Sequence, residues 1–237
     1  MLADNLATLR RQVIEAARRA GRPPEEITLL AVSKHVPWER LRQAVDLGQT
    51  AFGENYVQEA RGKIEALPPE LAWHFIGHLQ TNKCRDAVRL FSCIETVDRP
   101  ELARSLARHA AQADRILPVL VQVNIALEEQ KSGVAPTDCA ALLRLLAELP
   151  SLRLCGLMTM PPWHDDPEQN RPHFRALRLL AEDMRSQGLL PAQDMQLSMG
   201  MSADFPVAIE EGATIVRVGT ALFGSRQPPT SPSEEPR

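Results

Sequence analysis

The feature that most constrains the fold is an alternation, from residue 27 onward, of short apolar runs with longer amphipathic segments. The runs are rich in Val, Ile and Leu without a polar residue at every second position, a pattern typical of parallel strands covered on both faces. The predicted strands are residues 27–33, 50–54, 73–77, 93–97, 117–125, 152–160, 194–200 and 213–219. The predicted helices are residues 37–47, 56–67, 80–90, 100–113, 137–149, 168–188 and 204–211, with a last turn at 220–226.

Strands that alternate with helices form either an open doubly wound sheet or a closed barrel. Eight strand–helix units in about 200 residues favour an α/β fold of the (β/α)8 TIM-barrel type, whose typical size is only slightly larger. A doubly wound sheet normally carries a glycine-rich fingerprint after its first strand, whereas here the first strand runs into Ser-Lys-His-Val-Pro. We therefore predict a single barrel, preceded by an extra N-terminal helix that ends near Gly21.

Composition limits the domain organisation and the function classes. No linker divides the chain, so we predict one domain over residues 1–226, and a disordered tail at 227–237, which is rich in Pro, Ser and Glu. The formal net charge of −3 gives no bulk attraction to nucleic acid or anionic lipid. Four scattered cysteines indicate neither a zinc site nor a disulfide framework, and neither a signal peptide nor a membrane span is apparent. We expect a cytoplasmic protein with no metal site.

The lysine at the end of the first predicted strand is the sharpest single candidate for chemistry. Functional side chains of such barrels gather at the carboxyl ends of the strands, and Lys34 ends an apolar run there. Burial depresses the pKa of a lysine because it penalises the charged form, and a neutral amine is what condensation with a carbonyl requires. The alternative is a strand-end lysine that extends into water.

Two later segments favour a binding role. Residues 198–202 (SMGMS) and 217–224 (RVGTALFG) each place Gly beside Ser or Thr, directly after a strand and before a helix. Such turns offer backbone N–H groups and a hydroxyl to a phosphate, at the two loops where barrels often bind phosphate. Ordinary turn chemistry is the alternative for each segment alone. We interpret residues 161–173, which contain His164, as a solvated loop.

Six spaced motifs lie between residues 27 and 226, namely AVSKHVP, FGENYVQE, WHFIGHLQTNK, GLMTM, LSMGMS and RVGTALFG. In this order they resemble the pyridoxal phosphate homeostasis protein family, which is related to the N-terminal barrel of alanine racemase. The resemblance covers nearly the whole chain. It implies a barrel of the alanine racemase N-terminal type that binds pyridoxal 5′-phosphate (PLP).

The resemblance also implies roles for individual residues. Lys34 matches the lysine that holds PLP as a covalent aldimine, and Arg217 matches the arginine that faces the pyridine nitrogen. The matches to the phosphate binders are Ser198, Gly219 and Thr220, with the backbone of Met199 and Gly200 close by, and the matches to the pocket lining are Asn55 and Met158. The chain departs from the commonest family pattern at His35, where threonine is frequent, and at residues 125–133, which leaves the role of Lys131 open.

The function implied is a PLP-binding protein that holds, buffers or delivers the cofactor in vitamin B6 and amino-acid homeostasis, without dedicated catalytic turnover, and with apo PLP-dependent enzymes as partners. A cation facing the pyridine nitrogen disfavours its protonation and weakens the ring as an electron sink. Alanine racemase takes a second base, a tyrosine, from an additional domain and the neighbouring subunit, whereas the one tyrosine here, Tyr56, follows the second strand. The alternatives are a PLP-dependent amino-acid racemase and a Schiff-base aldolase. No exposed apolar seam is visible, so we expect a monomer.

Overall fold

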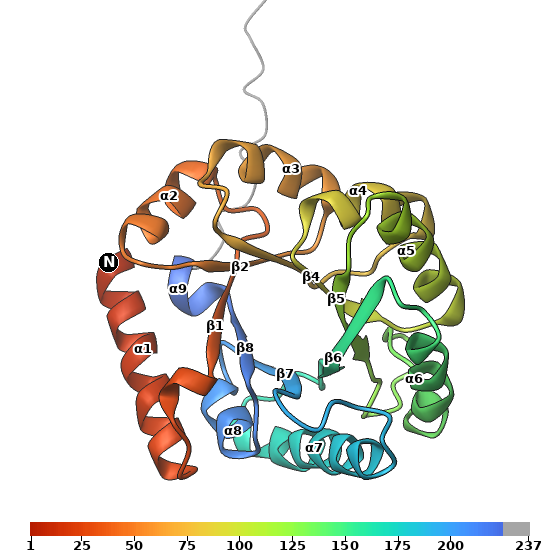
Figure 1. The fold of residues 1–237 in the computed structure, drawn as a ribbon. Helices are drawn as coiled ribbons and strands as arrows, with labels where there is room; N and C mark the ends of the chain where they lie inside the picture. Colours follow the sequence, from red (N-terminus) through yellow and green to blue (C-terminus); the bar gives the residue numbers. More distant parts are fainter. Residues whose placement is uncertain (225–237) are drawn as a thin grey trace, which may run out of the picture.

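The computed structural model describes residues 1–224, and within them eight parallel strands form one closed barrel ringed by helices (Figure 1). Each strand pairs with its neighbour in sequence, and β8 (Ile215–Val218) closes the barrel against β1 (Thr28–Val32). The predicted TIM barrel is therefore confirmed and the doubly wound sheet is excluded. The predicted tail, residues 227–237, lies outside the described residues, as do residues 225 and 226.

Every predicted strand and helix is present, with only its ends displaced. The other strands are β2 (Ala51–Glu54), β3 (Ala72–Phe75), β4 (Cys93–Val97), β5 (Leu117–Gln122), β6 (Leu152–Met158) and β7 (Gln196–Met201). The helices are α1 (Leu2–Arg19), α2 (Trp38–Asp46), α3 (Val57–Ala66), α4 (Cys84–Leu90), α5 (Pro100–Gln112), α6 (Cys139–Ala147), α7 (Arg171–Ser186), α8 (Phe205–Glu210) and α9 (Thr220–Phe223). Short 3-10 helices lie at Pro24–Glu26 (η1), Thr81–Lys83 (η2), Pro136–Asp138 (η3) and Pro167–Asn170 (η4).

The predicted N-terminal helix, α1, covers the seam where the barrel closes. It buries Leu6, Leu9 and Val13 on one face, at the three- and four-residue spacing of an amphipathic helix. This face packs against α8 and α9, beside β1 and β8 (Figure 1). The extra helix therefore completes the outer layer of the barrel.

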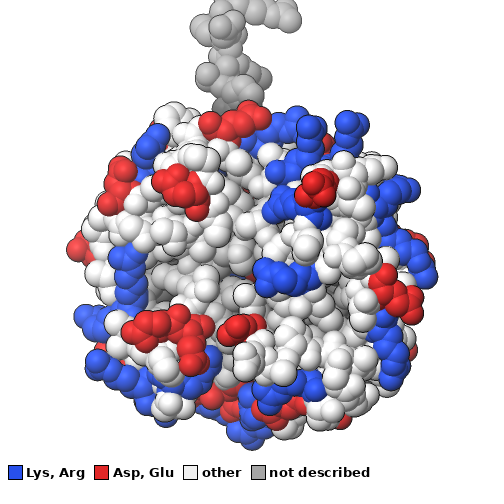
Figure 2. Space-filling model, viewed as in Figure 1, with Lys and Arg blue, Asp and Glu red and all other residues white. Residues whose placement is uncertain are grey.

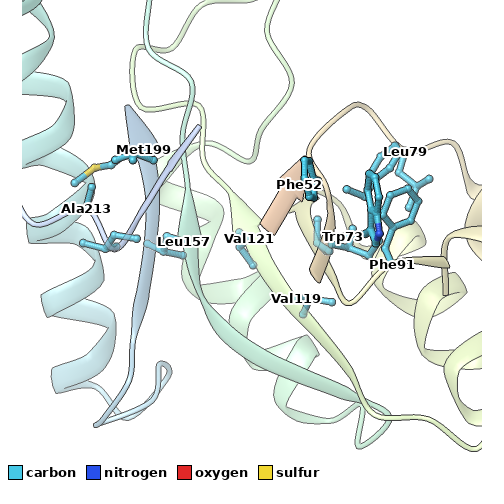
Figure 3. Close-up of a cluster of buried hydrophobic side chains, with 14 of the residues drawn as sticks. Phe52, Trp73, Leu79, Phe91, Val119, Val121, Leu157, Met199 and Ala213 are labelled. Atoms are coloured by element: carbon cyan, nitrogen blue, oxygen red, sulfur yellow. The ribbon is translucent and has the colours of Figure 1, made fainter. Parts of the chain in front are cut away.

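The main apolar core lies between the strands and the helices. Side chains of each strand alternate between the barrel interior and this outer layer. Figure 3 shows part of the layer, where Phe52 stacks on Trp73 with ring centroids 5.1 Å apart and Leu79 and Phe91 lie close by. Because both faces of the sheet are buried, the strands read as continuous apolar runs in the sequence.

The charged side chains on the face that Figure 2 shows are of both signs and lie intermixed around the ring of helices. No single sign of charge covers this face. In the part of the chain that the structure describes, no helix combines the length and the apolar character needed to cross a membrane.

Candidate functional site

Two cavities lie at opposite ends of the barrel. The larger, of about 510 Å³, opens at the amino ends of β1, β7 and β8, beside Thr28, Gln196 and Ile215. The smaller, of about 260 Å³, opens at the carboxyl ends of the strands, where barrels of this type carry their functional groups. Its volume suits one small ring compound, since pockets for drug-sized ligands begin near about 300 Å³. We take this carboxyl-end cavity as the candidate site.

Five of the predicted cofactor-binding residues line the carboxyl-end cavity. Lys34 follows β1, Asn55 follows β2, and Arg217, Gly219 and Thr220 lie on β8 or directly after it. These positions are far apart in the sequence, and they meet because parallel strands in a barrel end at the same face. An amine, an amide, a guanidinium and a turn rich in backbone N–H groups thus face one cavity.

Lys34 stands in a tight turn. The N–H of Val36 donates to the carbonyl of Ser33 at 3.0 Å, which makes Lys34 and His35 the central residues of a β-turn. His35 has a φ of 62°, in the left-handed region that non-glycine residues seldom adopt. Lys34 is half-buried and lines the cavity beside Val32, as expected for a side chain that runs from the core to the barrel mouth.

Asn55 offers the cavity a polar atom without a partner. Its Oδ1 is buried and accepts no hydrogen bond from any residue that the structure describes. A Cβ at position 77 would lie 2.3 Å from the Asn55 carbonyl oxygen, so Gly77 is needed for the two strand ends to approach this closely. Leaving a buried polar atom unpaired costs about 1–3 kcal/mol. This amide therefore fits a ligand with a polar group near the end of β2.

The turns after β7 and β8 form the polar end of the cavity. The hydroxyl of Ser202 accepts hydrogen bonds from the backbone N–H groups of Gly219, at 3.2 Å, and Ala221, at 3.4 Å. Ser202 and Thr220 both line the cavity. A phosphate or another oxyanion is the kind of group that two hydroxyls and adjacent N–H donors bind.

Ser202 was missed by the sequence reasoning, which selected Ser198 from the same motif. The pairing of β7 with β8 shifts register between Ser198 and Met201, so β7 carries an extra residue there. The bulge forms around Gly200, whose φ is 90° and whose added Cβ would lie 2.6 Å from that of Ala208. Ser202 is the first residue after β7, and its hydroxyl lies beside the backbone N–H of Gly219.

Ser198 instead belongs to a polar network inside the barrel. Its hydroxyl donates to Glu95 Oε2 at 2.5 Å and accepts from Arg217 Nη1 at 2.7 Å. Arg217 Nη2 donates to the carbonyl of Thr159 at 2.7 Å, and Glu95 Oε1 lies 2.6 Å from Nδ1 of His74. The chain of contacts fixes the guanidinium of Arg217 at the edge of the carboxyl-end cavity.

The charged groups of this network stabilise one another in their ionised forms. Burial alone would raise the pKa of Glu95, but His74, Arg217 and Ser198 together lower the pKa below its ordinary value. Burial lowers the pKa of Arg217, and the charges of Glu95 and Asp204 oppose that shift. The network therefore stabilises an ionised carboxylate deep in the barrel, directly beneath the candidate site.

Three other predicted residues lie away from the cavity lining. Met158 is fully buried in a cluster with Cys93, Leu120 and Cys155. Met199 is fully buried in the core layer under the helices, and Figure 3 draws it with Ala213. Gly200 shapes the β7 bulge described above. The structure thus brings Lys34, Asn55, Arg217, Gly219 and Thr220 together and separates Met158, Ser198, Met199 and Gly200 from them.

The loop after β6, which we interpreted as a solvated connection, supplies one wall of the cavity. Trp163 and His164 both line the cavity, although Trp163 remains 71% exposed. Asn170 anchors the loop, because its Nδ2 donates to the carbonyl of Pro162 at 3.0 Å and to Asp204 Oδ2 at 2.8 Å. Within residues 1–224, no group of three or more His, Cys, Asp or Glu side chains could hold a metal ion.

Comparison with known proteins gives consistent results over nearly the whole chain. Residues 5–227 match the model of the alanine racemase N-terminal domain. The chain is 43% identical over 225 residues to the pyridoxal phosphate homeostasis protein of Aquifex aeolicus (strain VF5), a match that covers 94% of this chain and 98% of that protein. It is 42% identical over 229 residues to the protein of the same name from Escherichia coli (strain K12), covering 95% and 97%.

Solved structures agree with these matches. PipY of Synechococcus elongatus PCC7942, solved with PLP bound, is similar with a TM-score of 0.81 and 38% identity, covering 94% of this chain and 100% of that chain. Alanine racemase from Corynebacterium glutamicum is similar with a TM-score of 0.70 and 19% identity, covering 94% of this chain and 62% of that chain. The second likeness is one of fold alone.

Proposed function

This chain belongs to the pyridoxal phosphate homeostasis protein family, and from that premise we propose that it binds PLP in the carboxyl-end cavity. It holds or delivers the cofactor and does not turn over a substrate of its own. The observation that carries the proposal is the meeting of the Lys34 amine, the Arg217 guanidinium and the Ser202–Thr220 end around one cavity of about 260 Å³. These groups suit the three parts of PLP, which are an aldehyde, a pyridine ring and a phosphate.

Lys34 makes the covalent link in this proposal. In its unprotonated form, the amine nitrogen would add to the aldehyde carbon of PLP, with formation of a C=N bond and loss of one water molecule. The same Schiff base is open to exchange, because another amine can add to the carbon and release Lys34. An amino acid or a lysine of an apo-enzyme is such an amine, which makes a covalently held cofactor transferable.

The phosphate is assigned to the turns after β7 and β8. Ser202 and Thr220 supply hydroxyl donors, and because the Ser202 oxygen accepts from the N–H groups of Gly219 and Ala221, its own proton is left to donate to the phosphate. Ser198, which matched a phosphate binder by resemblance, acts in this proposal through its hydrogen bond to Arg217. Met158 and Met199 contribute through packing, and Gly200 through the bulge of β7.

Arg217 favours a carrier over a catalyst. Its buried guanidinium is held by Ser198 and Thr159 and neutralised from below by Glu95. A cation of this kind beside the pyridine nitrogen disfavours protonation of the ring and so weakens the ring as an electron sink. We further propose that the protein acts as a cytoplasmic monomer, with apo PLP-dependent enzymes as recipients, and size-exclusion chromatography with light scattering tests the monomer.

The first test is covalent mapping. Added PLP should give the purified protein a visible absorbance band that Lys34→Ala lacks, and borohydride reduction with peptide mass mapping should place the modification on Lys34. Lys83→Ala is the matched control, because Lys83 lies on η2 and does not line the cavity. A wild-type protein that takes up no PLP, or that is modified at another lysine, contradicts the proposal.

The same proteins discriminate the enzyme alternatives. Racemisation of alanine by PLP-loaded protein well above the Lys34→Ala level would favour a racemase. Borohydride trapping of a sugar-phosphate adduct on PLP-free protein would favour an aldolase.

A second test concerns the phosphate end. Ser202→Ala should weaken binding of PLP by about 10- to 100-fold, because a hydrogen bond to a charged group contributes about 1.5–3 kcal/mol. Binding of pyridoxal, which lacks the phosphate, should be unchanged. Ser198→Ala is the comparison and should affect both compounds alike, since Ser198 contacts Arg217. An equal loss for PLP and pyridoxal in Ser202→Ala refutes the assignment.

A further inference from the structure

A lysine that does not line the carboxyl-end cavity is buried directly behind the turn that carries Lys34. Lys63 of α3 is 7% exposed, and its Nζ makes three short hydrogen bonds. The acceptors are the carbonyl of Ser33 at 2.6 Å, Glu54 Oε1 at 2.7 Å and Glu59 Oε1 at 2.7 Å. A buried ammonium requires such full pairing, since an unpaired one is strongly unfavourable.

The network holds both chain neighbours of Lys34. On one side, the Ser33 carbonyl accepts from Lys63 and the Ser33 hydroxyl donates to Glu54 Oε1 at 2.6 Å. On the other side, the backbone N–H of His35 donates to Glu59 Oε1 at 2.5 Å. Lys34 lies between the two anchored residues, so its Cα has little freedom to move.

The backbone conformation of His35 needs contacts from other parts of the chain to stabilise it. His35 adopts a φ of 62°, and a non-glycine residue in that region costs about 1–3 kcal/mol and persists only where its surroundings over-determine it. The Lys63 network is the surrounding that does so, because it contacts Ser33, two residues before the strained position, and through Glu59 it contacts the strained residue itself.

Alternation along β1 explains why the network and the cavity lie on opposite sides of one turn. Val32 and Lys34 line the cavity, whereas Ser33, between them, faces Glu54 and Lys63. Fixing Ser33 on the outer side therefore fixes the direction in which Lys34 leaves the strand.

We propose that Lys63, together with Glu54 and Glu59, is a positioning residue that holds the turn at residues 33–36 so that the amine of Lys34 meets the cofactor aldehyde. The inference rests on the proposed function and names what sets the reactivity of that site. Lys63 itself contacts no part of the cavity, and its effect passes through Lys34 alone.

The charges agree with this assignment. Burial alone would raise the pKa of Glu59, but hydrogen bonds from Lys63 and from the His35 N–H lower it below the ordinary value. Burial raises the pKa of Glu54, against the hydrogen bond and charge of Lys63 and the hydrogen bond of Ser33. Lys63 thus bridges the fully buried carboxyl of Glu54 and the half-buried carboxyl of Glu59 beside the turn that carries Lys34.

The test is a double-mutant cycle between Lys63 and Lys34. In the wild-type background, Lys63→Met should slow formation of the visible band on mixing with PLP by about tenfold or more, within the ~10²-fold that a misplacement of about 1 Å costs. In the Lys34→Ala background, where only noncovalent binding remains, Lys63→Met should leave the Kd for PLP unchanged within about twofold, the usual error of additivity. Lys83→Met is the matched control and should change neither.

Two further variants keep the inference testable. Lys63→Arg retains the charge and should recover part of the rate. Glu59→Gln, at a more exposed position, removes the charge that holds the His35 N–H and should slow the reaction if Lys63→Met does not fold. A Lys63→Met protein that reacts with PLP at the wild-type rate overturns the inference. A loss of PLP affinity in the Lys34→Ala background as large as the loss of rate overturns it too, because the effect would then not pass through Lys34.

Hydrogen exchange separates this inference from the proposed function. The amide of His35 should exchange faster in Lys63→Met and in Glu59→Gln than in the wild type, measured without any PLP. A wild-type protein that takes up no PLP refutes the proposed function. Unchanged exchange at His35 in both variants refutes the positioning role, whatever the outcome of the PLP experiment.

Discussion

The buried carboxylate of Glu95 offers the sharpest test of how the site is held. Glu95 is fully buried on β4, accepts from Ser198 at 2.5 Å and lies 2.6 Å from His74. Since an ionised carboxylate only accepts hydrogen bonds, Nδ1 of His74 must carry the donated proton. The Ser198 hydroxyl links the carboxylate to Arg217, which is 3% exposed, and the negative charge of Glu95 favours the charged guanidinium. Glu95→Gln removes this charge and almost no volume.

The expected loss of stability follows from what remains after the substitution. Glu95 pairs directly with His74 and reaches Arg217 through Ser198, so Glu95→Gln leaves the buried guanidinium without this charge. Removing one partner of a buried charged pair costs about 3–5 kcal/mol. In a chain of this size each kcal/mol lowers Tm by about 2–4 °C, so Tm should fall by roughly 6–20 °C. The loss should come from the stranded Arg217 rather than from the missing carboxylate. Arg217→Met added to Glu95→Gln should therefore restore part of the stability, which makes the two changes non-additive.

The pH dependence gives an independent check. In the folded protein, burial raises the pKa of Glu95, but His74, Arg217 and Ser198 lower it by more, so the pKa lies below its ordinary value. A lowered pKa means that the carboxylate contributes stability above the unfolded pKa of about 4.3, and that this contribution disappears as pH falls through the folded pKa. The free energies of unfolding of the wild type and of Glu95→Gln, measured in urea, should therefore become equal as the pH is lowered into the acid range. A difference below about 1 kcal/mol at neutral pH, or strict additivity with Arg217→Met, refutes the reasoning.

Three further predictions concern the packing of the barrel. Phe91→Ala should cost about 3–5 kcal/mol in urea unfolding, because the ring is fully buried and packs edge-on against Phe75 with centroids 5.1 Å apart; a loss near zero would show that the layer collapses around the gap. Gly200→Ala should lower the free energy of unfolding by about 1–3 kcal/mol, because Gly200 has a positive φ and an added Cβ would clash with α8. Gly62→Ala in α3 should instead raise the free energy of unfolding by about 0.5–1 kcal/mol, because an added Cβ meets nothing within 4 Å there. Burial raises the pKa of the Cys139 thiol to about 11, and all four cysteines are buried and free, so a thiol reagent should label none rapidly at neutral pH and all four in urea; fast labelling of the folded protein would contradict the structure.

The barrel could be predicted from the sequence because strands that are buried on both faces appear as continuous apolar runs. β4 coincides with the apolar run at residues 93–97, and α5 begins at Pro100, as a proline in the first helical turn predicts. Ends were less well predicted where the chain passes through a 3-10 turn. The helix predicted from residue 80 begins only at Cys84, after η2, since the first turn of a helix can adopt either hydrogen-bond pattern.

The site was predictable wherever counting along a strand places a residue. Lys34, Asn55 and Arg217 each lie at or just beyond a strand end, and strand ends meet at the barrel mouth. Counting was less exact at β7, because the strand continues to Met201, so Ser198 lies inside the barrel and Ser202 is the first residue beyond the strand. The signal that could have found it is the end of the predicted strand at residue 200, because Ser202 follows this end whereas Ser198 precedes it. The loop after β6 is too long for spacing to place Trp163.

The role of Lys63 was beyond the reach of the sequence for a related reason. Glu59 and Lys63 are four residues apart on α3, a spacing that on most helices indicates an exposed ion pair of little energetic weight. Burial changes its meaning, and burial arises only once Glu54 on β2 and the turn at residue 33 close over the pair. Only the folded chain brings these distant positions together.

The two buried networks share a purpose that stability does not explain. Replacing a buried ion pair by well-packed apolar residues is often neutral or stabilising, so a barrel optimised for stability alone would not need Glu95 or Lys63 in its interior. Both networks end beside a nitrogen-bearing side chain of the carboxyl-end cavity: one contacts Arg217 directly, and the other holds both chain neighbours of Lys34. Position is what they supply. The reversible covalent site that we propose needs its amine and its ring partner at fixed places without a bound substrate to organise them. Buried charge pairs tolerate little movement before they become unfavourable, and so they meet that need.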